Sequence, residues 1–222
     1  MSEVYQIAID GPSGSGKSTL AKGVSAKLGI MYLDTGAMYR TCGLCALKRG
    51  ISPRDVDAVK KMLDTMELKV EFKDGSQHMI LDGEDVTGFI RTPEVSIAAS
   101  DISALPCVRK AMVDMQRDIA SSQTFVLDGR DIGSNVLPNA KYKFFLTASA
   151  ETRAGRRLKE LNEKGDFSQN YEEVLRDIKY RDKQDSERAS APLVKVDDAI
   201  EIDTSVIGIE ETRDLLLSYI KE

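Results

Sequence analysis

Apolar residues recur along the chain in two patterns, one typical of buried strands and one typical of amphipathic helices. The strand-like runs occupy residues 5–10, 30–34, 124–128, 142–146 and 199–203. Helical spacing follows the first run as far as residue 28 and returns at residues 37–40, 52–63, 92–120 and 209–220, with a break near Pro106. Because strands alternate with helices, the pattern predicts an α/β fold around a parallel sheet.

Residues 67–86 follow a different pattern, in which apolar and polar residues alternate. The runs 68–72 and 78–81 are separated by the turn sequence Lys73-Asp74-Gly75-Ser76, and a third short run follows at 83–86. Alternation around a glycine-containing turn is typical of β-hairpins. We therefore expect a small antiparallel meander, inserted between core elements of a single domain.

Charge and composition narrow the classes of partner. The chain has 222 residues and a formal net charge of −5, which argues against a general nucleic-acid binder because such proteins need a broad cationic surface. No apolar run approaches the roughly 20 residues that cross a bilayer, and the N-terminus lacks the features of a signal peptide. We expect a cytoplasmic protein without membrane association, and a monomer because no extended heptad pattern is present.

The cysteines and the single histidine offer little chemistry. Cys42-Gly43-Leu44-Cys45 has the spacing of a C-x-x-C site, but it lies in an apolar helical stretch with no second pair of ligands. Buried thiols are therefore favoured over zinc or redox chemistry, also for Cys107. His78 lies in the meander with no nucleophile pattern nearby, which favours a surface or packing role.

A glycine-rich motif follows the first predicted strand directly and precedes the first predicted helix. It matches G-x-x-x-x-G-K-[ST] and comprises Gly11, Pro12, Ser13, Gly14, Ser15, Gly16, Lys17, Ser18 and Thr19. Glycines let backbone N–H groups curl around an anion, and the helix N-terminus adds its positive dipole end. The motif predicts a phosphate-binding loop in which Lys17 reaches the β- and γ-phosphates of a nucleotide and Ser18 offers its hydroxyl to Mg²⁺.

Arginine and aspartate residues gather near the ends of the later predicted strands and on two helices. They are Arg40, Arg109, Arg130, Asp131, Arg153, Arg156, Arg157, Arg181, Asp185 and Arg188. Two pairs spaced by four residues, Arg153 with Arg157 and Arg181 with Asp185, each share a helical face. Convergent guanidinium groups suit phosphoryl transfer because they bind phosphate oxygens and screen migrating charge. Exposed salt bridges on helices are the alternative for many of these arginines.

At this point the chain resembles the bacterial-type cytidylate kinases over essentially its full length. Five segments carry the resemblance: IDGPSGSGKST at 9–19, YLDTGAMYR at 32–40, LDGEDVTGFIRTPEV at 81–95, LDGRDIG at 127–133 and RDKQDSERASAPL at 181–193. The resemblance implies the three-layer P-loop NTPase fold with a core of about 1–35, 121–152 and 170–222. It also implies an inserted monophosphate-binding region at about 36–120, containing the small antiparallel sheet, and a short lid at about 153–169.

The same resemblance implies transfer of a phosphoryl group from ATP to CMP or dCMP, with Mg²⁺ accompanying the ATP. Lys17, Arg130 and Arg181 would stabilise the charge on the migrating group, and Arg153 and Arg157 would close over ATP as lid cations. Residues matching the family's acceptor site are Thr35, Tyr39, Arg40, Ser100, Arg109, Arg130, Asp131, Arg181, Asp185 and Arg188.

Within that set the resemblance assigns separate tasks. Arg40, Arg130 and Arg181 would hold phosphate, while Ser100 and Arg109 would read the cytosine ring. Asp131, Asp185 and Arg188 would bind the pentose hydroxyls or organise that pocket. Thr35 would contact the base or its surroundings; many relatives have serine there, and threonine adds a methyl group next to the base or sugar while it keeps the hydroxyl.

Two alternatives remain open at this stage. The chain could be another P-loop kinase acting on UMP, AMP or a small metabolite such as shikimate, or a nucleotide-dependent switch without acceptor kinase activity. The N-K-x-D signature of switch GTPases and the signature of transporter ATPases are both absent from the sequence. A weak RNA-binding role is disfavoured by the acidic net charge.

Overall fold

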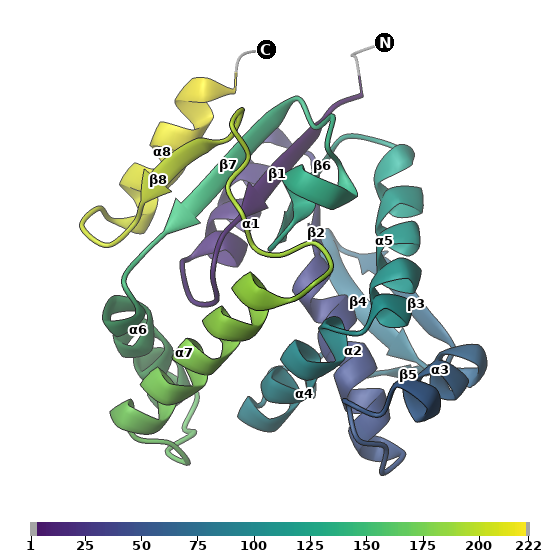
Figure 1. The fold of residues 1–222 in the computed structure, drawn as a ribbon. Coiled ribbons are helices and arrows are strands. Elements are labelled where there is room, and N and C mark those ends of the chain that lie inside the picture. The colour runs from purple at the N-terminus through teal and green to yellow at the C-terminus, as the bar shows by residue number, and fades with distance from the viewer. Residues whose placement is uncertain (1–3, 221–222) are drawn as a thin grey trace.

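A central parallel sheet forms the middle of the molecule in the computed structural model, which describes residues 4–220 (Figure 1). Its strands are β1 (Gln6–Asp10), β2 (Met31–Asp34), β6 (Phe125–Gly129), β7 (Tyr142–Thr147) and β8 (Ile200–Asp203). Their order is β2-β6-β1-β7-β8, and every neighbouring pair is parallel. The predicted α/β fold is confirmed; residues 1–3 and 221–222 of the expected domain lie outside the described residues.

Helices cover both faces of this sheet because its strands are apolar on both sides. On one face, Ile7 and Ile9 pack with residues of α1 (Lys17–Leu28) and α8 (Ile209–Tyr219). Ala8 points to the opposite face, where it shares a core with α2 (Thr35–Lys48) and α5 (Pro106–Ser121). The result is three layers, with the sheet as the middle one.

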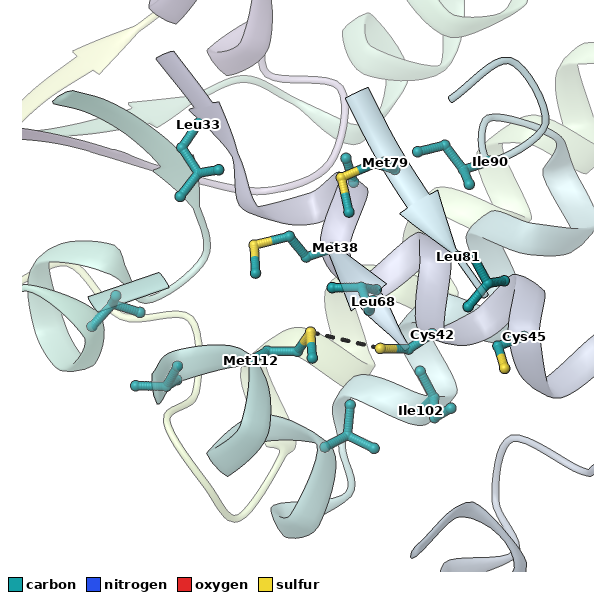
Figure 2. Packing of buried hydrophobic residues seen from close by; sticks show 14 of the residues in the cluster. Leu33, Met38, Cys42, Cys45, Leu68, Met79, Leu81, Ile90, Ile102 and Met112 are labelled. Atoms are coloured by element: carbon teal, nitrogen blue, oxygen red, sulfur yellow. Dashed lines mark hydrogen bonds between the residues drawn. The ribbon is translucent and has the colours of Figure 1, made fainter. Parts of the chain in front are cut away.

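The segment between α2 and α5 continues this second core outward. It contains α3 (Val56–Thr65), β3 (Leu68–Lys73), β4 (Ser76–Leu81), β5 (Glu84–Asp85) and α4 (Pro93–Ser103). The strands β3, β4 and β5 pair antiparallel in that order, so the predicted meander is confirmed. Figure 2 shows Met79 and Leu81 of β4 in the same apolar cluster as Met38 and Cys42 of α2. The meander is therefore packed onto the core instead of forming a separate one.

The cysteines and the histidine have the structural roles that the sequence indicated. Cys42 and Cys45 are buried, and burial raises the pKa of the Cys42 thiol to about 12. The Cys42 Sγ lies 3.6 Å from Met112 Sδ of α5 (Figure 2). His78 lies beside Asp85 in the meander, with 2.7 Å between Nδ1 and Oδ2.

Two long helices lie between β7 and β8 in the sequence. They are α6 (Ala150–Glu163) and α7 (Tyr171–Glu187), which pack together through a small apolar cluster of their own. Asn170 and Glu173 form a capping box that starts α7, which limits the turn between the helices to residues 164–170. Within residues 4–220, no helix is long and apolar enough to cross a membrane.

Two local features differ from the expected pattern. The helix α2 begins at Thr35, two residues earlier than the spacing indicated, because the Asp34 carboxylate caps it by accepting from the Ala37 N–H at 2.8 Å. A single π-helical turn, η1 (Ile132–Val136), follows β6, which no periodicity predicted. The Asp10 carboxylate accepts from the Ile132 and Gly133 N–H groups and ties this turn to β1.

Candidate active site

A cleft of about 810 Å³ opens at the carboxyl edge of the central sheet. It is lined by the loop after β1, the start of α2, the end of β6, and residues of α4, α6 and α7. Parallel strands with helices on both faces bind ligands at this edge. Most of the residues predicted from the sequence line this one cleft; Gly11, Pro12, Arg109 and Arg153 lie behind its surface.

The glycine-rich loop has the backbone conformation that its motif predicts. Gly11 has φ 146°, and a Cβ atom there would lie 2.2 Å from the Leu146 carbonyl oxygen of β7. Only glycine fits this approach between the loop and the sheet. The loop ends at Gly16, the N-cap of α1, so the helix N-terminus points into the cleft.

Lys17 is the buried cation of this loop. Its Nζ donates to the Pro12 carbonyl oxygen at 2.6 Å, and the side chain is almost fully enclosed. Burial and the nearby Arg130 charge lower the pKa of Lys17, while Asp128 and Asp185 oppose that shift. An anion in the loop would favour the charged form of Lys17.

Asp128, at the end of β6, organises the side of the cleft next to Lys17. Its carboxylate accepts from the Ser18 hydroxyl and from the Tyr32 hydroxyl, each at 2.8 Å. Burial raises the pKa of Asp128, and the Asp34 charge raises it further. The oxygens of Ser18 and Asp128 are the hard ligands that Mg²⁺ prefers, so this pair fits a magnesium ion brought with a phosphate ligand.

The Asp34 carboxylate at the end of β2 pairs with two arginines from different parts of the chain. Arg40 Nη2 donates to Asp34 Oδ2 at 2.9 Å, and Arg91 Nη2 donates to the same oxygen at 2.6 Å. Burial alone would raise the pKa of Asp34, but these two guanidinium groups hold it below its usual value. Arg40 was expected here, whereas Arg91 and Asp34 were not singled out.

Arg130 and Arg181 both line the cleft, but they differ in their ion-pair partners. Arg130 Nε donates to Asp185 Oδ2 at 2.6 Å. Arg181 makes no ion pair within residues 4–220, and its Nε is buried without a hydrogen-bond partner. Burial and the Arg130 charge lower the pKa of Arg181 to about 10, so it remains a cation at neutral pH.

Asp131 gathers polar side chains at the far end of the cleft. Its carboxylate accepts from Arg109, from Arg188 Nη2 at 3.0 Å and from Asn135 Nδ2 at 3.0 Å. Within residues 4–220, the Nε and Nη1 of Arg109 have no hydrogen-bond partner, although this residue is only 3% exposed. Unpaired buried donors cost free energy, so this end of the cleft is arranged for a polar ligand.

Three further predicted residues line the same end of the cleft. The Ser100 hydroxyl is buried and has no hydrogen-bond partner in the part of the chain that the structure describes. Tyr39 lies beneath the Arg109 guanidinium, with 5.9 Å from its ring centroid to Cζ. Thr35 lines the cleft, but its hydroxyl donates to the Asp128 carbonyl oxygen at 2.6 Å, so in this structure that hydroxyl holds α2 against β6.

The arginines of α6 divide in a way that the sequence did not indicate. Arg153 is buried, pairs with Asp182 of α7 at 2.6 Å, and donates to the Ser13 carbonyl oxygen at 3.0 Å. It therefore supports the glycine-rich loop from behind. Arg156 and Arg157 line the cleft instead, and Arg157 also donates to the Arg91 carbonyl oxygen at 3.2 Å.

Sequence reasoning missed carboxylates whose role depends on their neighbours in space, namely Asp34 and Asp128. Both follow apolar runs, so each was visible as an acidic residue at the end of a predicted strand. That position is the available signal for a site residue in a parallel sheet. Gln116 and Arg91, which also line the cleft, carried no comparable signal.

Known proteins resemble this chain over nearly its whole length. The model of the family described as cytidylate kinase matches residues 7–222. The cytidylate kinase of Caldicellulosiruptor bescii is 48% identical over 95% of this chain and 93% of its own. That of Halalkalibacterium halodurans is 47% identical over 97% of each. A crystal structure of an uncharacterized protein from Eubacterium ventriosum has a TM-score of 0.52 at 16% identity, covering 98% of both chains, and bears on the fold alone.

Proposed function

Because the chain belongs to the cytidylate kinase family, we propose that it transfers the γ-phosphoryl group of ATP to CMP or dCMP, giving ADP and CDP or dCDP. The chain is thus a nucleoside monophosphate kinase, a transferase. The finer assignments below, namely the role of each residue and the use of Mg²⁺, are supported by the geometry of the cleft.

The observation that carries the proposal is the unpaired guanidinium of Arg181. It lies in the cleft that also holds the phosphate-binding loop, and within residues 4–220 it has no carboxylate partner. Burying an unpaired cation is costly. A phosphate group between the loop and Arg181 supplies the missing anion, and arginine binds phosphate oxygens with its planar fork.

The donor nucleotide is assigned to the side of the cleft formed by residues 11–19. Backbone N–H groups of the loop and the N-terminus of α1 hold the phosphates of ATP, and Lys17 contacts the β- and γ-phosphates. Ser18, held by Asp128, would bind Mg²⁺. When bound, Mg²⁺ neutralises part of the phosphate charge. Arg156 and Arg157 of α6 line this cleft as cations for the same phosphates, while Arg153 braces the loop.

The acceptor nucleotide is assigned to the side formed by α2, α4 and the end of β6. Arg40, Arg130 and Arg181 hold its phosphate. The Ser100 hydroxyl and the Nε and Nη1 groups of Arg109, which have no partner within residues 4–220, read the cytosine ring, which has acceptor atoms on its edge. Asp131, Asp185 and Arg188 form the pentose pocket. Tyr39 and Thr35 complete the wall through their contacts with Arg109 and Asp128.

Catalysis in this arrangement comes from positioning and charge. The acceptor phosphate oxygen attacks the γ-phosphorus in line, the bond to the ADP oxygen breaks, and no bond to the protein forms. Lys17, Arg130 and Arg181 stabilise the charge that develops on the migrating group. Closing of α6 and its arginines over the cleft excludes water, which would otherwise accept the phosphoryl group.

The setting of the enzyme is also part of the proposal. We expect a monomer that acts in the cytoplasm on small nucleotides and does not bind nucleic acid. These expectations rest on the acidic net charge and on the absence of a heptad pattern in the sequence. Light scattering on the purified protein measures the first of them.

The decisive assay measures ADP formation from ATP and Mg²⁺ with CMP, dCMP, UMP, AMP or no acceptor in parallel. Strong stimulation by CMP and dCMP is the expected result. Stimulation by UMP or AMP instead would move the chain to another acceptor specificity. Turnover that does not depend on an acceptor would support the nucleotide-dependent switch that the sequence alone left open.

A further inference from the structure

Gln77 is a polar residue on the apolar face of β4. Side chains alternate along a strand, so Gln77 points to the same side as Met79 and Leu81. Those two are buried in the core shared with α2 (Figure 2). A half-buried amide in that row needs a partner, because an unpaired buried amide is costly.

The partner is the backbone at the end of β2. Gln77 Oε1 accepts from the Asp34 N–H at 2.7 Å, and Gln77 Nε2 donates to the Asp34 carbonyl oxygen at 3.2 Å. The strand β2 lies at the edge of the central sheet and pairs with β6 on its other side. The Gln77 amide therefore takes the place of a neighbouring strand at this one residue.

Asp34, whose backbone Gln77 holds, is also the residue that orients Arg40 and Arg91. The Asp34 carboxylate accepts from Arg40 and Arg91 and also caps α2. A rotation of the Asp34 backbone would move all three contacts together. Gln77 itself does not line the cleft, so it reaches the site only through Asp34.

We propose that Gln77 is a positioning residue that connects the antiparallel meander to the acceptor-phosphate site, by holding the Asp34 backbone and through it Arg40 and Arg91. This inference rests on the proposed function, in which Arg40 binds the acceptor phosphate. In this proposal the meander contributes to the reaction, because its inner face positions the arginines that bind the acceptor phosphate.

The first test is Gln77→Met, which keeps the length of the side chain and removes both hydrogen bonds. The KM for CMP should rise by about tenfold, while the KM for ATP and kcat stay near the wild-type values. Binding of cytidine, which has no phosphate, should be unchanged in calorimetry. A variant in which both CMP and cytidine bind more weakly by the same factor would place the defect in the base pocket and overturn the proposal.

Val70→Ala is the matched control for a loss of stability. Val70 pairs with Met79 across the same sheet and is half-buried, and its apolar side chain offers the Asp34 backbone no hydrogen bond. It should lower the midpoint of thermal unfolding and leave the KM for CMP unchanged. If Val70→Ala raises the KM for CMP as much as Gln77→Met does, Gln77 has only a structural role.

Gln77→Glu supplies a readout that stability alone does not move. An ionised carboxylate can accept from the Asp34 N–H, but its second oxygen then faces the Asp34 carbonyl oxygen. Protonation turns that oxygen into a donor and restores both bonds. The ratio of the variant's KM for CMP to that of the wild type should therefore shrink as the pH falls from about 8 to about 6. A ratio that does not change with pH contradicts the proposed contact.

The wild-type assay separates this inference from the proposed function. If the wild type phosphorylates another monophosphate and not CMP, the proposed function fails. The same variants are then measured with that acceptor, and a selective rise in its KM still supports the role of Gln77. If CMP is the acceptor and Gln77→Met leaves its KM unchanged in a folded protein, this inference fails alone.

Discussion

The arginines of the cleft differ chiefly in whether a carboxylate of the protein pairs with them before any ligand binds. Arg130 has Asp185 and Arg40 has Asp34, whereas Arg181 has no carboxylate partner within residues 4–220. Paired arginines are held in place, which lowers the entropy lost when a ligand binds. The unpaired one has the most to gain from an incoming phosphate.

Lys17→Ala tests the cation of the phosphate-binding loop. Turnover should fall by about a hundredfold or more, because the charge on the migrating group loses its nearest ammonium donor. The fold should stay intact, since the hydrogen bonds of Lys17 Nζ within residues 4–220 go to Pro12 and Ser15 of its own loop. Steady-state kinetics and circular dichroism measure both. Lys27→Ala, an exposed change on the same helix, is the control; a folded Lys17→Ala protein with normal turnover would refute the role.

Arg181→Ala and Arg188→Ala should act on different steps. Loss of Arg181 should mainly lower kcat for both acceptors, because it removes a cation from the phosphate. Arg188 is held by Asp131 and by the Ala191 carbonyl oxygen, and our proposal assigns it to the pentose pocket. Its loss should raise KM, and more for CMP than for dCMP. Kinetics with both acceptors measure this, and equal losses in the Arg188 variant would count against a role at the 2′-hydroxyl.

At the scale of elements, the side of the cleft that we assign to the acceptor is shaped by how closely α2 and α4 approach each other. Gly43 of α2 lies against the backbone of α4, where an added Cβ would be 2.8 Å from the Ala99 nitrogen. The same two helices carry Tyr39, Arg40 and Ser100 into the cleft. Their separation therefore affects both stability and the acceptor site.

Gly43→Ala should lower the free energy of unfolding by about 1–3 kcal/mol, because the helices must move apart to admit the methyl group. The KM for CMP should rise while the KM for ATP stays constant, since the phosphate-binding loop lies on other elements. Urea unfolding and steady-state kinetics measure these effects.

Gly155→Ala is the control: it lies in α6, where the added Cβ would have no neighbour within 4 Å in the described part of the chain apart from the adjacent residues and its own helix backbone, so it should be neutral or stabilise by about 0.5–1 kcal/mol. Equal effects of both changes would show that helix propensity, and not the close approach, decides.

Local patterns predicted most elements well because each has a periodicity of its own. The meander is an example, since residues 68–81 alternate around a turn and form β3 and β4. The π-helical turn at Ile132–Val136 was missed because its backbone follows from the Asp10 carboxylate, which is far away in sequence. The start of α2 was misplaced for a smaller reason, an aspartate that serves as both strand end and helix cap.

At the scale of the whole molecule, polar contacts join the inserted region to the helices on the other side of the cleft. Arg54, which precedes α3, donates to Asp101 of α4, and both contact the hydroxyl of Tyr180 in α7. The Arg157 contact with the Arg91 carbonyl oxygen makes a second bridge. These contacts favour the arrangement in which the two sides of the cleft lie close together.

Arg54→Ala should weaken both substrates together, because the cleft binds ATP and CMP between the joined parts. The Arg54 side chain is 65% exposed, and exposed ion pairs contribute little. The KM values for ATP and CMP should therefore each rise, by no more than about fivefold. Steady-state kinetics measure both, with the exposed Lys60→Ala of α3 as the control. A rise confined to one substrate would contradict a role in joining the two sides.

The phosphate-binding loop and the order of strands and helices could be predicted from the sequence alone, because both depend on residues that are neighbours along the chain. Gly11 to Thr19 are contiguous, so both the glycines that shape the loop and the side chains of Lys17 and Ser18 are visible in one motif. The partners of the arginines could not be predicted, because an ion pair depends on which helices meet in space. Only the tertiary structure placed Arg153 behind the loop with Asp182, left Arg181 unpaired in the cleft, and joined Gln77 to Asp34 across 43 residues.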